Sequence, residues 1–347
     1  MKRIFIVAEI GCNHNGNKEL AKKMVLEAKK CNVDAVKFQT FRAKDLISKF
    51  APKADYQKKT TGILDSQLEM TRKLELSRED FLELKGYAIS LGLSVFSTPF
   101  DLSSIEFLET TGQRIWKIPS GEITNLPYLE RIGKIKCENK KIILSTGMAT
   151  KAEVKKSIDI LLKAGTKKDE IVILQCNTEY PTPDKDMNIL AINDLKKTFP
   201  EFEVGFSDHS VGYIAAVGAT VLGVSMIEKH FTLDKDMAGP DHKASATPEE
   251  LKMMVENVRR MEDMLGNGKK IVTESERKNK VVARKSIIAK KNIKAGEVLT
   301  EKNIICKRPG NGISPMEWYN ILGSIAESDF AEDELITSKN IAWQKEI

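Results

Sequence analysis

The regular alternation of strand-like and helix-like segments restricts the fold of this chain more than any other feature. Short apolar runs typical of buried strands occur at residues 4–8, 35–38, 94–97, 115–118, 142–145, 171–176, 203–206 and 226–229. Amphipathic helical patterns lie between or after them, at residues 18–30, 78–91, 103–110, 151–164, 190–199, 213–222 and 248–265. Strands that alternate with helices form parallel sheets through right-handed crossovers. Eight repeats predict an α/β fold, a closed (β/α)8 TIM barrel.

The chain also has room for a smaller domain, because its 347 residues exceed the roughly 250 that such a barrel needs. Residues 45–74 read as an enlarged loop with a helix near 66–74, and residues 266–282 lack an apolar period. Short strand-like runs and a glycine-rich loop follow. We therefore expect a catalytic barrel over 1–265, a linker over 266–282 and a small β-rich domain over 283–347. Such a small domain is expected to pack against another surface.

Composition excludes several classes of protein. The net charge of +6 arises from 55 basic and 49 acidic residues that are scattered along the chain, so no nucleic-acid partner is expected. No run approaches the roughly 18 apolar residues of a membrane span, and a strand at residue 4 leaves no room for a signal peptide. Five cysteines without C-x-x-C spacing predict reduced thiols. The sequence predicts a cytoplasmic protein without a membrane partner.

Polar side chains follow all eight predicted strands. The carboxyl ends of barrel strands lie on one face, where their loops build the active site. A purely structural sheet needs no such residues, so this face is the predicted site. The candidates are Glu9, Lys37, Gln39, Thr40, Lys117, Ser120, Glu122, Ser145, Asn177, Thr178, Tyr180, Ser207, His209, Glu228 and His230.

Two lysines and two Ser-Gly turns indicate an anionic, phosphate-bearing ligand. Lys37 and Lys117 end the second and fourth strands, where their ammonium groups face the barrel mouth. Ser120 and Ser145 precede glycines at predicted helix starts, where backbone amides bind phosphate. Each serine alone is more simply a helix cap. The convergence of all four features favours the phosphate ligand.

His209 and His230 are the metal candidates. They are two of only four histidines, and they end consecutive strands. A lone histidine at a strand end is more often a structural residue, but the pair favours a ligand role. Two imidazoles without cysteine leave coordination positions open, which suits Mn²⁺ or Mg²⁺ acting as a Lewis acid.

Four carboxylates are candidates for acid–base work or for binding sugar hydroxyls: Glu9, Glu122, Glu228 and Asp241. Buried carboxylates need partners such as lysines, a metal or a ligand. Glu228 could equally orient one of the histidines. Cys176 lies near a strand end, but no histidine is expected to act as its base, so a nucleophilic role is not favoured.

A series of short motifs resembles those of the sialic acid synthase family. They are VAEIGCNHNG at 7–16, VKFQT at 36–40, FSTPF at 96–100, KIPSGE at 117–122, STGM at 145–148, YPTP at 180–183, FSDH at 206–209, EKHFT at 228–232 and GPD at 239–241. The tail motif KRPGNGI at 307–313 resembles the antifreeze-like (SAF, β-clip) domain of that family. The likeness runs in order from residue 3 to about residue 336, and it is strongest to the bacterial N-acetylneuraminate synthases.

The resemblance implies a reaction. Members condense phosphoenolpyruvate with N-acetylmannosamine and water, giving N-acetylneuraminate and phosphate by C–C bond formation with C–O cleavage. It also implies a divalent metal, with Mn²⁺ as the first choice and Mg²⁺ or Co²⁺ as alternatives, and a domain-swapped homodimer. The product would enter sialic acid biosynthesis for a capsule or lipooligosaccharide polysaccharide.

The resemblance also implies roles for residues. Glu9, Gln39, Tyr180 and Asp241 would surround the sugar and the reacting water, and Glu9 or Glu122 would handle that water. His209 and His230 would hold the metal, and Arg308 would enter from the second subunit. Some relatives carry Thr-Asn where this chain has Asn177-Thr178, so either side chain could meet the phosphate. Phosphoenolpyruvate would be bound by Lys37, Lys117, Ser120, Ser145, Asn177 or Thr178, and Ser207, and Thr40 and Glu228 complete the expected substrate-binding set.

Three alternatives remain at this stage. Synthases of legionaminic or pseudaminic acid, and those that use 6-phosphorylated N-acetylmannosamine, share these motifs. A Schiff-base aldolase on the same barrel would use Lys37 or Lys117 as its nucleophile. A non-enzymatic sugar-binding protein is suggested only by the small tail domain, and the density of polar groups at the barrel mouth counts against it.

Overall fold

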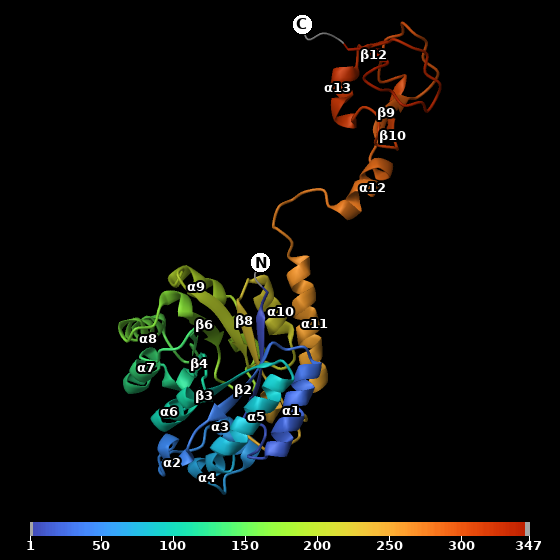
Figure 1. The fold of residues 1–347 in the computed structure, drawn as a ribbon. Helices are drawn as coiled ribbons and strands as arrows, with labels where there is room; N and C mark the ends of the chain where they lie inside the picture. The colour runs from blue at the N-terminus through green and yellow to red at the C-terminus, as the bar shows by residue number, and fades with distance from the viewer. Residues whose placement is uncertain (1–2, 344–347) are drawn as a thin grey trace. The chain divides into compact units, whose positions relative to one another are not determined.

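A computed structural model describes residues 3–343, arranged as two compact units, Met1–Gly266 and Asn267–Ile347 (Figure 1). Residues 1–2 and 344–347, which the expected domains include, lie outside the described residues. In the first unit, eight parallel strands follow the order β3-β2-β1-β8-β7-β6-β5-β4, with helices around them. The predicted (β/α)8 fold is confirmed.

Each predicted strand segment overlaps a strand of the structure. Apolar side chains that point inward, including Val7, Phe96 and Leu174, fill the barrel interior, and the outward side chains pack under the helices. This burial on both faces explains the nearly continuous apolar runs of the sequence. The strands are β1 (Phe5–Gly11), β2 (Ala35–Thr40), β3 (Ser94–Pro99), β4 (Ile115–Ile118), β5 (Lys141–Ser145), β6 (Ile171–Cys176), β7 (Glu203–Asp208) and β8 (Met226–His230).

The helices of this unit match the predicted ones except in two places. The enlarged loop after β2 holds three short helices instead of one, and the eight-residue helix after β4 was not predicted, because it is too short to show a clear period. No helix among residues 3–343 is long and apolar enough to cross a membrane. The helices are α1 (Lys18–Lys30), α2 (Ala43–Leu46), α3 (Asp55–Thr61), α4 (Gln67–Arg72), α5 (Arg78–Ser90), α6 (Leu102–Thr110), α7 (Leu126–Gly133), α8 (Lys151–Lys163), α9 (Ala191–Thr198), α10 (Ile214–Val221) and α11 (Pro248–Met264).

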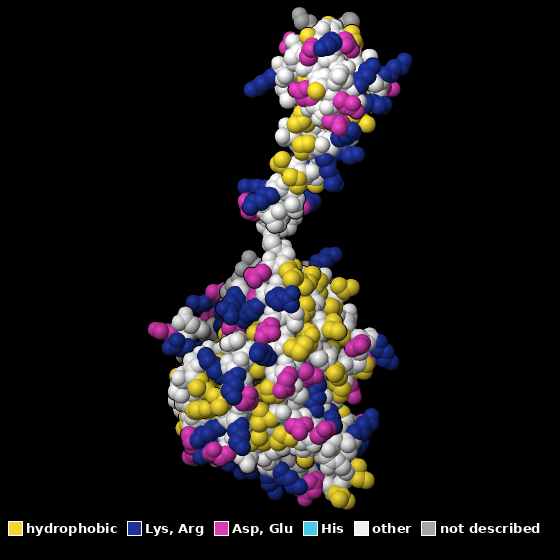
Figure 2. All heavy atoms as spheres, turned by 90° about the vertical axis from the view of Figure 1, so that its right-hand side faces the viewer, with side chains coloured by type: hydrophobic (Ala, Val, Ile, Leu, Met, Phe, Trp, Pro, Cys, Tyr) yellow, Lys and Arg dark blue, Asp and Glu magenta, His cyan; other side chains and the backbone are white. Residues whose placement is uncertain are grey.

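Hydrophobic side chains also reach the surface of the first unit. Figure 2 shows them gathered between charged groups on one face. Helix α10 is apolar around its whole circumference, so Ile214 and Val221 stay exposed while Ala216 and Ala219 are buried. The sequence of α10 therefore predicts a helix but does not by itself reveal which side faces the core.

The second unit has its own small core. It contains α12 (Glu274–Ala283), β9 (Ser286–Ala289), β10 (Ile304–Lys307), α13 (Trp318–Ile321), β11 (Ile325–Ala326) and β12 (Ile341–Ala342). Strand β9 pairs with β10, and β11 with β12, both antiparallel, around buried side chains that include Leu299 and Phe330. The expected linker, 266–282, holds most of α12, whose first turn is closed by a capping box between Thr273 and Glu276.

Two side chains form hydrogen bonds at the place where two neighbouring barrel strands do not pair through their backbones. Among the described residues, β3 and β4 share no ladder and form the seam of the barrel. Gln113 accepts a hydrogen bond from the Ser97 amide at 2.8 Å and donates to the Ser97 carbonyl at 2.9 Å. The Tyr128 hydroxyl donates to the Pro99 carbonyl at 2.7 Å and lies 3.5 Å from the carbonyl of Lys117 on β4. Two side chains thus replace the missing backbone bonds at the seam.

The substitution Gln113→Met tests this role of the seam. Methionine has nearly the same length but leaves the buried amide and carbonyl of Ser97 unpaired, and each unpaired group costs about 1–3 kcal/mol. We expect the free energy of unfolding, measured with urea, to fall by that order. The control Gln67→Met, at a half-buried glutamine of α4, should change it by less than about 0.5 kcal/mol. Equal effects of the two substitutions would contradict the proposed bridge.

Candidate active site

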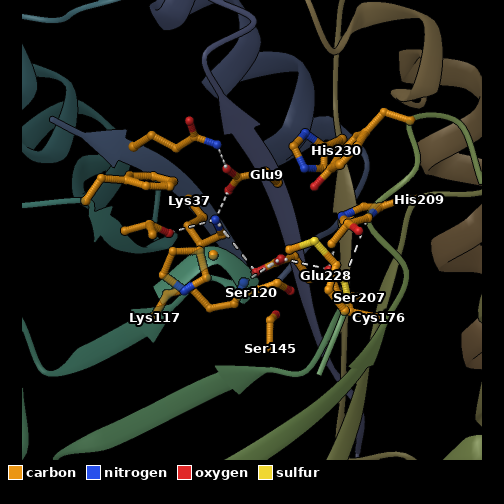
Figure 3. Close-up of a pocket in the computed structure, with 18 residues that line it drawn as sticks. Glu9, Lys37, Lys117, Ser120, Ser145, Cys176, Ser207, His209, Glu228 and His230 are labelled. Carbon is orange, nitrogen blue, oxygen red and sulfur yellow. Dashed lines mark hydrogen bonds and ion pairs between the residues drawn. The ribbon is translucent and has the colours of Figure 1, made fainter. Parts of the chain in front are cut away.

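A cavity opens at the carboxyl ends of the strands, where the sequence places the site (Figure 3). Because neighbouring parallel strands end at the same edge, side chains far apart in the sequence meet there. The residues expected from the sequence that line this cavity are Glu9, Lys37, Gln39, Lys117, Ser120, Ser145, Thr178, Tyr180, Ser207, His209, Glu228 and His230.

Four buried charged groups form the floor of the cavity. Lys37 Nζ lies 2.5 Å from Glu9 Oε2 and 3.8 Å from Glu228 Oε2, and Lys117 Nζ lies 3.0 Å from Glu228 Oε1. No side chain of the four exceeds 5% exposure. Two ammonium groups and two carboxylates balance in charge, which is the condition for burying all of them. We call these four residues the charge tetrad.

Neighbouring groups fix the tetrad in place. Gln39 Nε2 donates to Glu9 Oε1 at 3.0 Å, and Lys37 donates to Thr98 Oγ1 at 2.9 Å. Gly11 follows a register shift in β1 with φ of 55°, and a Cβ there would lie 2.8 Å from Glu9 Oε1. A side chain at position 11 would therefore displace the Glu9 carboxylate.

The two tetrad carboxylates differ in their pKa. Burial raises the pKa of Glu9 to about 7, since Lys37 offsets only part of the desolvation and Glu228 adds to it. Burial also disfavours the charged form of Glu228, but Lys117 and Lys37 outweigh this effect and lower the pKa of Glu228. Glu228 is therefore the permanent counter-ion, and Glu9 is the carboxylate that can exchange a proton near neutral pH.

The hydroxyls of Ser120 and Ser145 lie beside the tetrad, and the turn at Gly147 packs tightly against Ser120. Ser120 Oγ accepts from the Gly147 amide at 3.0 Å, which leaves its own proton free to donate. Ser145 Oγ is buried, and no residue within 3–343 is its hydrogen-bond partner. A Cβ at Gly147 would lie 2.6 Å from Thr178 Cγ2 and 2.7 Å from Ser120 Oγ. Free donors beside two ammonium groups suit a phosphate.

The two imidazoles also fit their expected role. Their ring centroids are 5.2 Å apart, His209 Nδ1 bonds to the Asn177 carbonyl, and His209 Nε2 lies 3.4 Å from Ser207 Oγ. His230 Nδ1 is buried without a hydrogen-bond partner among the described residues and lies 3.8 Å from Asp241 Oδ2. Burial and the neighbouring His209 hold the pKa of His230 well below its ordinary value. Burial lowers the pKa of His209, but Cys176 and the Asn177 carbonyl outweigh burial and raise that pKa. Both rings would bind a metal in their neutral form.

The two imidazoles alone would not fill the coordination sphere of a metal ion. Within 3–343, no cluster of three or more His, Cys, Asp or Glu side chains could hold a metal ion. Two imidazoles would thus leave several coordination positions for water or substrate, as in catalytic rather than structural sites.

Aromatic rings cover the histidines. The ring of Tyr180 stacks on that of His209 at 4.1 Å and meets that of His230 edge-on at 5.4 Å. Tyr56, from α3 in the enlarged loop, stacks on Tyr180 at 5.4 Å. Tyr56 was not among the expected residues, since nothing in the loop pattern shows that α3 turns toward the mouth.

Two expected residues from the first half of the barrel do not line the cavity. Glu122 accepts a hydrogen bond from Asn125 at 2.6 Å, and burial raises its pKa. Thr40 shares a 2.7 Å hydrogen bond with Ser97 and lines a separate pocket. Of the two carboxylates considered for the water, only Glu9 faces the cavity.

Three further expected residues lie away from the cavity lining. Asn177 Oδ1 accepts from the Glu179 amide, so Thr178, not Asn177, faces the cavity. Asp241 lies behind His230 and accepts a bond from Cys12. Arg308 belongs to the second unit, where it donates to a backbone carbonyl.

The structure adds two residues to the site. Thr98 ends β3, where the sequence also predicts polar side chains, and it accepts a hydrogen bond from Lys37. Cys176 lines the cavity with its Sγ 3.7 Å from His209 Nδ1, so a histidine lies beside this thiol. Burial opposes ionisation of Cys176, but His209 and Lys117 lower its pKa.

Comparison with known proteins identifies the family. The sequence pattern of the NeuB family matches residues 24–270, and that of the SAF domain matches residues 284–342. The chain belongs to the NeuB family. This confirms the resemblance read from the motifs, and it identifies the second unit as a SAF domain.

Relatives cover the chain almost completely. An N,N'-diacetyllegionaminic acid synthase of Campylobacter jejuni is 49% identical over 97% of this chain and 99% of its own length. A pseudaminic acid synthase of Campylobacter jejuni is 38% identical over 94% of both chains. The crystal structure of an N-acetylneuraminic acid synthetase from Leptospira borgpetersenii, in complex with citrate, is 31% identical over 80% of this chain and 90% of its own, with a TM-score of 0.70. The chain is an enzyme of this family.

The raised pKa of Glu9 predicts how stability changes with pH. The folded chain holds this proton more tightly than the unfolded chain, so the contribution is full below about pH 4.5 and is lost as the pH rises through about 7. The variant Glu9→Gln lacks this titration. We expect the free energy of unfolding of the wild type, minus that of the variant, to fall by an amount on the order of 3 kcal/mol between about pH 5 and pH 8. A difference that is constant or rises would contradict the pKa of Glu9.

Proposed function

We propose that this enzyme condenses phosphoenolpyruvate with a six-carbon amino sugar and water, forming a nonulosonic acid and releasing phosphate. The charge tetrad carries the proposal, because it places two ammonium groups beneath the free hydroxyls of Ser120 and Ser145 and beside the pair of imidazoles. A phosphate site, an open metal site and a carboxylate with a pKa near neutrality are the parts that this reaction needs.

We further propose that the product is N,N'-diacetyllegionaminic acid and that the sugar carries two acetamido groups. Identity supports this, at 49% to the legionaminic relative, 38% to the pseudaminic relative and 31% to the N-acetylneuraminic synthetase. The proposal replaces the initial expectation of N-acetylneuraminate with one of its alternatives. The motifs that the family shares could not separate these products.

In the proposed complex, Lys37 and Lys117 bind the anionic groups of phosphoenolpyruvate. Ser145 and Ser120 donate to its phosphate, and Ser207, whose hydroxyl now donates to Glu228 at 3.0 Å, is a further donor at the same depth. Glu228 holds both lysines in place, so the substrate meets a preformed site.

The proposed reaction uses these positions. The methylene carbon of phosphoenolpyruvate bonds to the aldehyde carbon of the sugar, which leaves C2 electron-deficient. The former aldehyde oxygen takes up a proton and becomes a hydroxyl, and water adds to C2 while Glu9 accepts its proton. Cleavage of the bond between C2 and the phosphate oxygen then releases phosphate, as the new C2 hydroxyl loses its proton to leave a ketone. His209 and His230 would hold a divalent cation, Mn²⁺ by family likeness, that supplies Lewis acidity at the aldehyde. Entry of Arg308 from a second subunit, in a domain-swapped dimer, stays a prediction.

A phosphate-release assay tests the substrate. Phosphoenolpyruvate is supplied with N-acetylmannosamine, its 6-phosphate, or the diacetamido hexoses that correspond to legionaminic and pseudaminic acids, each with Mn²⁺ or with EDTA. We expect the highest kcat/KM with the legionaminic precursor, and loss of turnover in EDTA. A preference for another sugar would show that the proposed product is wrong, but the proposed condensation reaction would still stand. Turnover in EDTA with borohydride trapping of Lys37 or Lys117 would instead indicate a Schiff-base aldolase.

A pair of variants tests the assignment of the base. Glu9→Gln keeps the size of the side chain but cannot accept a proton, so we expect kcat to fall by about 10²–10⁴-fold. Glu122→Gln changes a carboxylate outside the cavity and should alter kcat only a few-fold. Circular dichroism would check that both variants are folded. A larger loss in Glu122→Gln than in Glu9→Gln would reverse the assignment.

A further inference from the structure

A second buried ion pair immediately precedes the two histidines along β7 and β8. Asp208 and Lys229 are partners in the register of β7 and β8, and the next residue along each strand is His209 or His230. Lys229 Nζ lies 3.1 Å from Asp208 Oδ2, and neither side chain is more than 1% exposed. The pair is thus the last cross-strand contact before the imidazoles.

This pair does not face the cavity. Successive side chains of a strand point to opposite faces, and Ser207 and Glu228 line the cavity. Asp208 and Lys229 therefore point outward, beneath the helical layer, and neither is part of the cavity lining. They cannot touch a substrate, so any role in the reaction acts through their neighbours.

The pair holds the backbone that follows His209. Asp208 Oδ1 accepts from the Ser210 amide at 2.9 Å and from the Ser210 hydroxyl at 2.6 Å. Lys229, on the neighbouring strand, donates to the Ser210 carbonyl at 2.5 Å. The Thr182 amide donates to the His209 carbonyl at 2.9 Å. Ser210 is thus fixed through all three of its polar groups, and β8 is tied to the turn that carries His209.

Stability alone does not account for such a pair. Taking two charges out of water costs several kcal/mol each, and well-packed apolar residues at such positions are often equally or more stabilising. Apolar side chains could not bind the amide, hydroxyl and carbonyl of Ser210. What the charges add is a fixed geometry for the end of β7 relative to β8.

We propose that Asp208, Lys229 and Ser210 form a positioning clamp that sets the spacing of His209 and His230 for a divalent cation. The inference rests on the metal site of the proposed function. Two ligands on separate strands bind a cation tightly only if their separation is fixed before it arrives, because any adjustment is subtracted from the binding free energy.

The clamp is tested by the affinity for Mn²⁺, measured by isothermal titration calorimetry without substrate. The double variant Asp208→Asn with Lys229→Met removes both charges, so neither is left unpaired. We expect its Kd for Mn²⁺ to rise by about 10–100-fold, as for other residues that support metal ligands. Ser210→Ala removes only the hydroxyl bond and should raise Kd by a smaller factor. It also keeps the test decisive if the double variant fails to fold.

Lys140→Met is the matched control. Lys140 is also a buried lysine; it donates to the carbonyls of Gly133 and Ile135 and lies 3.5 Å from Glu170. The control should lower the free energy of unfolding but leave the Kd for Mn²⁺ unchanged. An equal rise of Kd in the control would show that the effect comes from a general loss of stability, which would contradict the clamp. Clamp variants that fold and keep the wild-type Kd would also contradict it.

The wild type and His230→Asn separate this inference from the proposed function. If the wild type binds Mn²⁺ and His230→Asn does not, the metal site stands and the clamp variants decide the inference. If the wild type binds no Mn²⁺, or His230→Asn binds it equally well, the metal site of the proposed function fails and the clamp fails with it.

Discussion

The charge tetrad of Glu9, Lys37, Lys117 and Glu228 is the interaction on which the rest of the site depends. Four charges can be buried together only when each has an opposite charge within ion-pair distance, which requires β1, β2, β4 and β8 to end at one depth. The barrel satisfies that requirement through its register, since Glu9 lies opposite Lys37 on the adjacent strand. The register of the barrel strands therefore decides whether the four buried charges can be paired. The same constraint makes Glu228 a permanent anion and leaves Glu9 able to exchange a proton.

Much of this could be predicted from the sequence, because strand positions follow from apolar runs and a barrel places all strand ends on one face. The lysines, histidines and Glu228 met in the cavity for that reason. Residues in the turns after the strands were harder, since the direction of a turn side chain depends on local hydrogen bonds that no periodicity encodes. Glu122, bonded to Asn125, and Asn177, bonded to the Glu179 amide, show this limit. The acceptor sugar was beyond reach because motifs shared by the family carry the common chemistry.

The two faces of β7 and β8 perform different tasks in the proposed enzyme. Ser207, His209, Glu228 and His230 face the cavity, where reactivity requires free nitrogens and exchangeable protons. Asp208 and Lys229 alternate with them on the outer face, where they pair with each other and bind the polar groups of Ser210. Alternation along a strand thus separates the groups that react from the groups that hold them. In the family motifs FSDH and EKHFT, both kinds of residue stand side by side.

The seam between β3 and β4 bears on how the barrel avoids pairing with other chains. A closed barrel has no free strand edges, and unpaired edges are templates for pairing with other chains. Here the last closure depends on the side chains of Gln113 and Tyr128 and not on a backbone ladder. Loss of these two groups would expose two neighbouring edges at once. By bonding to the edge of β3, Gln113 and Tyr128 occupy backbone groups that would otherwise be free to pair with another chain.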